Sequence, residues 1–242
     1  MTDRRAPARA KSALGTAIGG GIIGSLLTAA ALFFALPNVL SSRIVRQGLI
    51  ADPKILTDAV DALRDAQYMP VLTANRAAIE TPFGSSWKGS AKPDVTLVEF
   101  FDYACPYCKA SNPSVDRLVQ EDKSLRIVYR ELPILGPDSM TAAQLSLEAS
   151  KLGRFAQFHD ALWSAGRPAP DTIATAAKAA GVAPQPQNDP AIEAELKRNF
   201  QLAGQLGATG TPLFVIGDRV MNGAVGYDAL KQAIDEARKK AS

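Results

Sequence analysis

The two cysteines of this chain lie three positions apart, in the sequence Cys105-Pro106-Tyr107-Cys108. An apolar, β-prone stretch at residues 95–101 precedes them. A helix-compatible stretch follows, in which Pro106 occupies a place that suits the first turn of a helix. At such a junction the first sulfur lies beside unpaired backbone N–H groups and the positive end of the helix dipole. Both features favour a thiolate at Cys105, so the spacing indicates redox chemistry.

Other uses of a cysteine pair fit this spacing less well. A disulfide that closes a two-residue gap restrains little of the unfolded chain. A zinc site usually needs four nitrogen or sulfur ligands. The single histidine, His159, lies more than 50 residues away, and we expect it to be a packed or surface helix residue. Soft thiolates suit Cu(I), so a copper-binding protein or a membrane-tethered holdase stays open as a different class. We predict no cofactor and no resident metal ion.

The charge of the chain is concentrated at its N-terminus. The net charge of +3 arises within the first 11 residues, where Arg4, Arg5, Arg9 and Lys11 outnumber Asp3. Without these residues, the 27 basic and 24 acidic side chains reduce to 23 of each. No basic face for nucleic acid is therefore implied.

An uncharged apolar segment follows this basic tail. Residues 13–36 form a stretch of 24 residues without charge, and about 20 such residues span a hydrocarbon core. With residues 1–12 held in the cytoplasm by their positive charge, the rest of the chain is expected in the periplasm. We therefore predict a single-pass anchor in the inner membrane. The alternative is a signal peptide that is cleaved to release a periplasmic protein. In either case disulfides persist around the rest of the chain.

Residues 38–80 are predicted to form a helical stalk. Asp52-Pro53 is a strong helix start, because an N-cap residue precedes a proline at the first helical position. Apolar residues then recur at helical spacing, as at Ile55, Val60 and Leu63. A Gly-, Ser- and Pro-rich linker is expected at residues 81–93. A helix packed on its own domain is one interpretation. We favour a stalk that is buried by other copies of the chain, giving a homo-oligomer.

The remaining residues predict an α/β domain with a helical insertion. Strand, helix and strand are expected at residues 95–103, 106–121 and 125–129, which implies a parallel pair. A hairpin at residues 213–221 and a helix at residues 226–240 complete the same sheet. Residues 94–137 and 208–242 would form this domain, and residues 138–207 a helical domain inserted beside it.

These elements and motifs resemble the DsbA type of thioredoxin-fold protein, over about residues 90–240. Residues 98–108 resemble the family's active-site strand and C-x-x-C motif, and residues 209–214 resemble its cis-proline loop. The resemblance implies a thiol–disulfide oxidoreductase that acts on cysteine-containing protein clients. It also implies a membrane partner that resets the redox pair.

The resemblance also assigns roles to individual residues. Cys105 would be the exposed attacking thiolate, and Cys108 the more buried thiol that resolves the mixed disulfide. Glu99, six residues before Cys105, would relay the Cys108 proton, unless it faces solvent from its strand. Pro212, if cis, would expose the backbone of Thr211 to an extended client segment, and the alternative is an ordinary trans proline.

Two departures from the strongly oxidising members bear on the direction of the reaction. Tyr107 stands where those members carry histidine, and Thr211 stands where they tend to carry valine. A neutral phenol supports a thiolate less than histidine does, so a less oxidising couple is expected. Residues 46–67 are similar to the oligomerisation segment of the suppressor-of-copper-sensitivity C type. These features slightly favour an isomerase or reductase over a dithiol oxidase.

Overall fold

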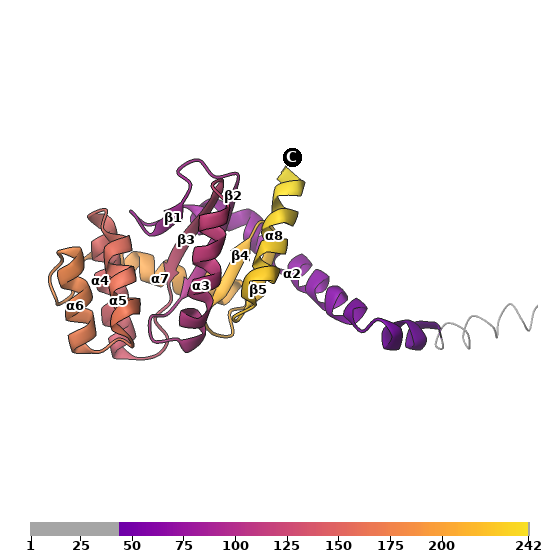
Figure 1. Ribbon diagram of the computed structural model, residues 1–242, viewed down its shortest axis with the longest axis horizontal. Coiled ribbons are helices and arrows are strands. Elements are labelled where there is room, and N and C mark those ends of the chain that lie inside the picture. Colours follow the sequence, from indigo (N-terminus) through magenta and orange to yellow (C-terminus); the bar gives the residue numbers. More distant parts are fainter. Residues whose placement is uncertain (1–43, 242) are drawn as a thin grey trace, which may run out of the picture. The chain divides into compact units, whose positions relative to one another are not determined.

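A five-stranded sheet with the order β1-β3-β2-β4-β5 lies at the centre of residues 62–241 (Figure 1). The structure, a computed structural model, describes residues 44–241. The strands are β1 (Trp87–Gly89), β2 (Val95–Phe101), β3 (Leu125–Glu131), β4 (Leu213–Ile216) and β5 (Arg219–Asn222). β2 and β3 run parallel, as a strand–helix–strand crossover requires, and each of the other neighbouring pairs is antiparallel.

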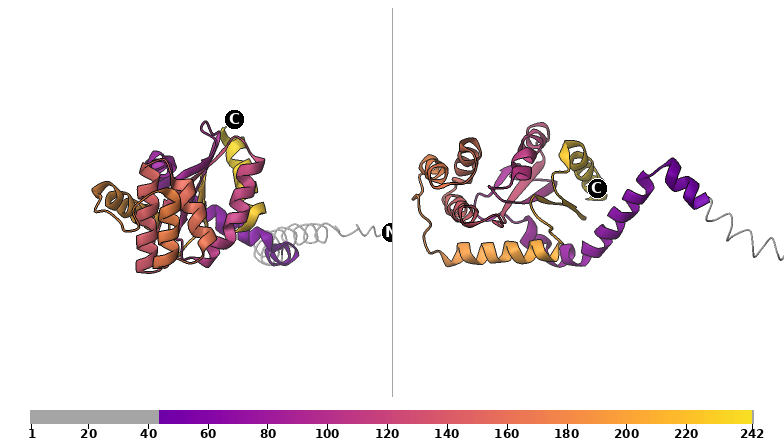
Figure 2. Two further views of the ribbon diagram at one scale, coloured as in Figure 1. Left: turned by 60° about the vertical axis from the view of Figure 1, so that its left-hand side comes forward. Right: turned by 90° about the horizontal axis from the view of Figure 1, so that it is seen from below.

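Helices cover both faces of this sheet (Figure 2). The helices are α2 (Lys54–Glu80), α3 (Pro106–Glu121), α4 (Pro137–Lys151), α5 (Phe155–Ala165), α6 (Pro170–Ala180), α7 (Pro190–Gln205) and α8 (Gly226–Ala241). α3 and α8 pack on one face, and α7 packs on the other beside the C-terminal half of α2. Because both faces are covered, the central strands are buried on both sides and read as continuous apolar runs.

Strand alternation decides which side of the sheet each residue of β2 faces. Leu97 and Phe101 belong to the core beneath α3 and α8, whereas Val98 and Phe100 belong to the core beneath α2 and α7. Glu99 lies between Val98 and Phe100 in sequence, so its side chain shares the α3 face with Leu97 and Phe101. The predicted strand therefore delivers a carboxyl group to the interior on the side of the cysteine helix.

The arrangement is a thioredoxin-like α/β fold with a helical insertion between β3 and β4, as the sequence predicted. The insertion comprises α4 to α7. The insertion was predicted to lie beside the sheet, but its last helix, α7, packs against a face of the sheet. Leu202, Ala203 and Leu206, near the end of α7, help to form the core on the sheet face opposite α3.

The structure also divides the predicted stalk and linker differently. The described residues fall into two units, which divide between Asp61 and Ala62. Leu72 and Ile79 of α2 are buried in the core of the second unit, so the C-terminal half of this helix belongs to that unit. The predicted linker contains β1, whose Trp87 pairs with Val128 of β3. Its three residues are too few to stand out from the surrounding Gly, Ser and Pro.

The predicted membrane segment, residues 13–36, and the basic tail, residues 1–12, lie outside the described residues. Among residues 44–241, no helix has the length and apolarity needed to cross a membrane. In the first unit, residues 44–51 are helical. The backbone N–H of Lys54 donates a hydrogen bond to Asp52 Oδ1 over 3.1 Å, which is the N-cap that the sequence predicted for α2.

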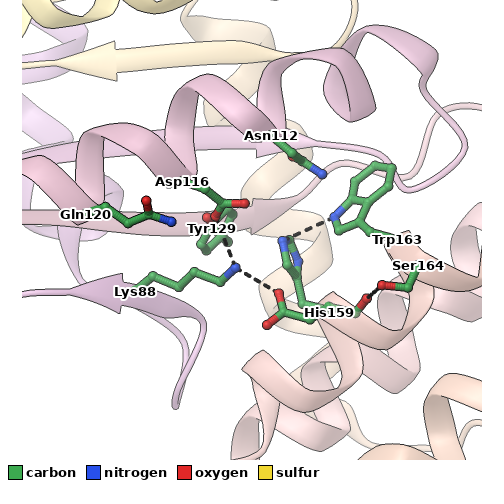
Figure 3. Close-up of a pocket in the computed structure, with 9 residues that line it drawn as sticks. Lys88, Asn112, Asp116, Gln120, Tyr129, His159, Trp163 and Ser164 are labelled. Atoms are coloured by element: carbon green, nitrogen blue, oxygen red, sulfur yellow. Dashed lines mark hydrogen bonds and ion pairs between the residues drawn. The ribbon is translucent and has the colours of Figure 1, made fainter.

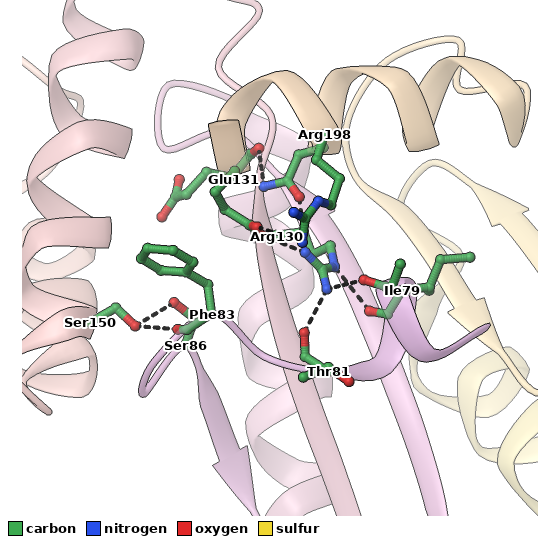
Figure 4. Close-up of polar contacts among 11 residues, drawn as sticks. Ile79, Thr81, Phe83, Ser86, Arg130, Glu131, Ser150 and Arg198 are labelled. Carbon is green, nitrogen blue, oxygen red and sulfur yellow. Dashed lines mark hydrogen bonds and ion pairs between the residues drawn. The ribbon is translucent and has the colours of Figure 1, made fainter. Parts of the chain in front are cut away.

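A buried arginine fixes the end of α2 to the sheet and to α7 (Figure 4). Arg130 of β3 is 2% exposed. Its guanidinium donates to the carbonyl oxygens of Ala78, Ile79 and Thr81, which satisfies acceptors at the C-terminus of α2. The same group pairs with Glu195 and donates to Asn199 Oδ1, both on α7. One side chain therefore joins three elements.

We predict that Arg130→Met destabilises residues 62–241 strongly. The substitution leaves the buried Glu195 with only the exposed and more distant Arg198, and leaves the α2 carbonyls without their donor, which costs about 3–5 kcal/mol. Urea unfolding with both cysteines reduced measures the change. Arg198→Met is the matched control, because Arg198 is 56% exposed and lies 3.7 Å from Glu195; it should change the free energy of unfolding by less than about 1 kcal/mol. Similar effects of the two substitutions would contradict this role of Arg130.

Candidate active site

The loop between β2 and α3 positions the first cysteine at the start of a helix. Cys105 is the N-cap residue of α3 and Pro106 takes its first turn. The carboxylate of Asp102 accepts hydrogen bonds from the backbone N–H groups of Ala104 at 2.7 Å, Ile134 at 2.8 Å and Leu135 at 2.9 Å. Asp102 is itself 1% exposed. This buried carboxylate therefore fixes both the turn before Cys105 and the segment after β3.

Cys105 lies against the loop that contains Pro212. The Thr211–Pro212 peptide bond is cis, which is the conformation that the resemblance implied. The Cys105 thiol donates a hydrogen bond to the carbonyl oxygen of Thr211 over 3.1 Å. Cys105 is only 4% exposed, so the prediction of an exposed thiol is wrong. The loop with the cis proline covers the sulfur, and this long-range contact leaves no trace in the local sequence.

Cys108 lies one helical turn further along α3 and has no exposed surface. Burial raises the pKa of the Cys108 thiol, and the negative charge of Glu99 raises it further. The Thr211 hydroxyl and the Asp102 backbone act in the opposite direction. The sequence predicted that Cys108 would be the more buried of the two thiols, and the structure agrees.

Glu99 is a carboxyl group enclosed by the core. It is 1% exposed, and neither carboxyl oxygen has a hydrogen-bond partner among the residues that the structure describes. Burial raises the pKa of Glu99 from 4.5 to about 8; Asp116 raises it as well, and Lys88 lowers it. The structure therefore excludes a solvent-facing Glu99.

Lys88 and Asp116 belong to a polar cavity of about 470 Å³ between β1, α3 and α5 (Figure 3). Lys88 Nζ lies 2.8 Å from Asp160 Oδ1 and 3.4 Å from Asp116 Oδ1. Gln120 and Asn112 of α3 also line the cavity. Lys88 and Asp116, which act electrostatically on the buried Glu99, are thus partly open to water: their side chains are 21% and 47% exposed.

A chain of hydrogen bonds leads from α5, beside this cavity, through Tyr103 to α4. Trp163 Nε1 donates to His159 Nε2 over 3.1 Å, and an indole can only donate. His159 Nδ1 therefore carries the ring proton and donates to the Tyr103 hydroxyl at 3.1 Å, which in turn donates to Ser146 Oγ at 3.0 Å. Burial lowers the pKa of His159 well below its ordinary value, which keeps the ring neutral. Of the two alternatives that the sequence left open for His159, a packed or a surface helix residue, the structure shows the packed one.

The structure brings together five of the seven residues predicted for the site. Cys105 and Cys108 lie at the start of α3, and Glu99 lies on β2 close enough to act on the Cys108 thiol. Thr211, joined to Pro212 by the cis bond, contacts Cys105 from the loop before β4. Pro106 and Tyr107 lie on the surface, and Tyr107 is 64% exposed.

Sequence reasoning gave no role to Asp102 or to the chain through Tyr103 and His159. An Asp placed three residues before a helix N-cap, where it can accept from the backbone N–H two residues further on, is a local signal that could have found Asp102. The chain through His159 joins residues far apart in sequence, so spacing gave no signal for it.

Fold and site together define a thioredoxin-fold protein with a redox-type cysteine pair. A model of the DSBA-like thioredoxin domain matches residues 96–235, which is more than half of the chain. The chain therefore belongs to the DSBA-like thioredoxin domain family. Residues Cys105, Cys108 and Pro212 all lie within the matched region.

Solved structures extend this similarity. A thioredoxin-like oxidoreductase from Silicibacter pomeroyi DSS-3 is 36% identical, with a TM-score of 0.63, and the match covers 68% of this chain and 98% of that one. ScsC from Proteus mirabilis, in a compact conformation, is 28% identical, with a TM-score of 0.64, and the match covers 83% of this chain and 98% of that one.

The chain is also similar to a part of each of two curated antiporters. The Na(+)/H(+) antiporter NhaA 3 of Salinispora tropica is 36% identical over 77 residues, which is 31% of this chain and 12% of the antiporter. A second antiporter of that genus, from Salinispora arenicola, is matched over 24% of its length. The chain thus spans less than a quarter of the length of these curated relatives.

The raised pKa of Glu99 predicts a pH-dependent stability. A proton binds Glu99 more tightly in the folded state, so the folded protein is most favoured below about pH 4.5 and loses this stabilisation as the pH rises to about 8. Glu99→Gln removes the titration. Relative to the parent protein, the variant should gain a few kcal/mol in free energy of unfolding between pH 5 and 8.5. Urea unfolding of both reduced proteins across this range measures it, and parallel pH profiles would rule out the titration of Glu99.

Proposed function

We propose that this protein is a thiol–disulfide oxidoreductase that exchanges disulfides with protein clients through Cys105 and Cys108. The observation that supports this most is the placement of the pair. Cys105 lies at the N-terminus of α3 against a cis-proline loop, and Cys108 lies buried one turn behind it. Membership of the DSBA-like family supports the same chemistry.

The proposed exchange proceeds in two steps of disulfide transfer. The Cys105 thiolate attacks one sulfur of a client disulfide, the client S–S bond breaks, and the second client sulfur leaves as a thiolate. The Cys108 thiolate then attacks Cys105 Sγ and releases the first client sulfur. The client gains two electrons and the pair becomes a disulfide. The reverse sequence introduces a disulfide into a client dithiol.

Glu99 serves the second step in this proposal. Burial and the charge of Glu99 both oppose ionisation of the Cys108 thiol. A base within the same interior is therefore needed, and a pKa of about 8 suits proton transfer near neutral pH. The cavity beside Lys88 and Asp116 gives water a place from which to exchange the Glu99 proton.

Thr211 and Pro212 serve client binding in this proposal. Pro212 has no N–H, and the Thr211 carbonyl accepts the Cys105 thiol proton. Once that thiol has lost its proton or entered a mixed disulfide, the carbonyl is free to accept from the backbone N–H of an extended client segment. Pairing of this kind uses main-chain groups, so it suits clients of varied sequence.

Single cysteine substitutions test the proposed roles. Reduced Cys108→Ala should accumulate mixed disulfides with a client that contains disulfide bonds, because the resolving thiol is missing. Cys105→Ala should trap none, because its remaining thiol is fully buried. Mass spectrometry of the products under non-reducing conditions measures the yields, and the double variant is the control for non-specific oxidation. Equal trapping by both single variants would overturn the assignment.

For the direction of exchange we favour isomerisation or reduction, with dithiol oxidation as the alternative. Tyr107 and Thr211 support a couple that is less oxidising than that of a histidine-containing pair. The similarity to ScsC over 83% of this chain extends beyond the catalytic domain.

For the location we propose an inner-membrane anchor, a catalytic domain in the periplasm, and a membrane partner that resets the pair. One similar structure is that of a periplasmic thioredoxin-like protein from Salmonella enterica serovar Typhimurium.

We also propose that the N-terminal helices assemble the protein into a homo-oligomer. Apolar side chains of these helices are 36–71% exposed in the single chain, and burying them would be favourable. They are Ile44, Val45, Leu49, Ile50, Ile55, Leu56, Val60 and Leu63. Several catalytic domains held together can engage one misfolded client at more than one point, which suits isomerisation.

Shortening the chain tests this assembly and the direction of exchange together. A chain that starts at residue 38 should be an oligomer, and one that starts at Ala62, where the second unit begins, should be a monomer. The monomer should keep its dithiol chemistry but lose most of its ability to rearrange scrambled ribonuclease. Light scattering and the refolding assay measure the two effects. The longer chain with Ile50→Asp and Leu56→Asp is the matched control and should behave as the monomer. A monomeric parent, or equal isomerase activity in both lengths, would exclude this role of the stalk.

A further inference from the structure

A second and smaller cavity opens directly beside the reactive cysteine. It has a volume of about 190 Å³, and Cys105 and Tyr103 form part of its wall. Trp163, at the end of α5, forms another part, and the loop after α5 contributes Arg167. The Cys105 thiol donates a hydrogen bond to the Thr211 carbonyl. The cavity and the cis-proline loop therefore both border the same sulfur. A client segment bonded to Cys105 would have its neighbouring side chains within reach of it.

Two cations border this cavity. Lys109 of α3 and Arg167 both line it, and both side chains are exposed. Within residues 44–241, neither has a carboxylate partner, and no acidic side chain lines the cavity.

Some other exposed cations of the domain do have such partners, as Arg117 has Glu121 and Lys151 has Asp189. Others, such as Lys123 and Lys178, have none among the described residues. Lys109 and Arg167 differ from these because they border one cavity, at the surface where a client sulfur must arrive.

The cavity combines an apolar wall with a charged rim. Trp163 and Tyr103 supply aromatic surface, and their ring centroids lie 5.2 Å apart. Trp163 is held in place because its Nε1 donates to the buried His159. A short acidic side chain fits this design, since its methylene group would contact the rings while its carboxylate would reach the cations. A basic side chain would meet two like charges.

We propose that Lys109 and Arg167 select client segments that carry Asp or Glu next to the reacting cysteine. The inference rests on disulfide exchange at Cys105 and adds a preference among clients. The carboxylate forms ion pairs with the two cations while the client sulfur is bonded to Cys105. Lys109 and Arg167 are specificity residues here, since neither takes part in the transfer of electrons or protons.

Symmetrical peptide disulfides test this preference. The peptides carry Asp, Asn or Lys immediately before the cysteine and are otherwise identical, and the protein carries Cys108→Ala so that the reaction stops at the first step. The Cys105 thiolate attacks one peptide sulfur, one peptide stays bonded to Cys105, and the other leaves as a thiolate. The rate of adduct formation is measured by mass spectrometry. Each rate is divided by that of 2-mercaptoethanol with the same peptide, which removes the effect of the neighbour on the intrinsic reactivity.

The expected preference for Asp over Asn is about three- to ten-fold at low salt, as two partly exposed ion pairs would give. It should fall toward one in 0.5 M NaCl. Lys109→Gln with Arg167→Gln should abolish it while the rate with the Asn peptide stays within about two-fold. Lys178→Gln is the matched control, because Lys178 is an exposed cation on α6, and it should keep the preference.

The outcomes separate this inference from the function on which it rests. Reaction with all three peptides at equal normalised rates overturns the preference and leaves disulfide exchange in place. An Asp preference that survives the double substitution overturns the role of Lys109 and Arg167. Failure of every peptide to react would overturn exchange at Cys105 itself.

Discussion

The burial of Cys108 and Glu99 in one apolar interior is the constraint on which the site depends. Each group can carry a negative charge, yet neither has access to water at its own position, and the charge of Glu99 raises the pKa of Cys108. The interior therefore favours at most one negative charge at a time. In the proposed exchange, this constraint would couple the loss of a proton from Cys108 to its gain by Glu99. Such coupling would depend on the packing of α3 over β2.

Asp102 is a second buried carboxyl group beside the cysteine pair, and unlike Glu99 it is fully provided with hydrogen-bond donors. Its carboxylate is as buried as that of Glu99, but it accepts three backbone hydrogen bonds. These three donors fix the position of the carboxylate, which works as a structural anchor. Glu99, three residues earlier in the chain, has no such donors among the described residues. The anchored turn holds Cys105 at the helix start, and in the proposed exchange Glu99 takes the Cys108 proton.

Local patterns in the sequence predicted the features that depend on neighbouring residues. The bounds of α3 agree with the sequence prediction, as does the N-cap at Asp52, because propensity and capping are local. The burial of Cys105 was not predictable, since it depends on a loop 106 residues away. The division of α2 was hidden for a related reason. Its apolar positions continue along the whole helix, and only the sheet shows that Leu72 and Ile79 are covered while Leu63 is exposed.

Trp163 connects the buried chemistry with the surface of the site. Its ring lines both the polar cavity beside Lys88 and the smaller cavity beside Cys105, so the two spaces share one wall. The indole N–H fixes that wall through His159, Tyr103 and Ser146 to α4 of the helical insertion. Since His159 is neutral and buried, this support stays unchanged across the pH range in which Glu99 titrates. The insertion therefore contributes more than bulk to the thioredoxin-like fold. Through Trp163 it supplies a wall between the polar cavity beside Lys88 and the smaller cavity beside Cys105.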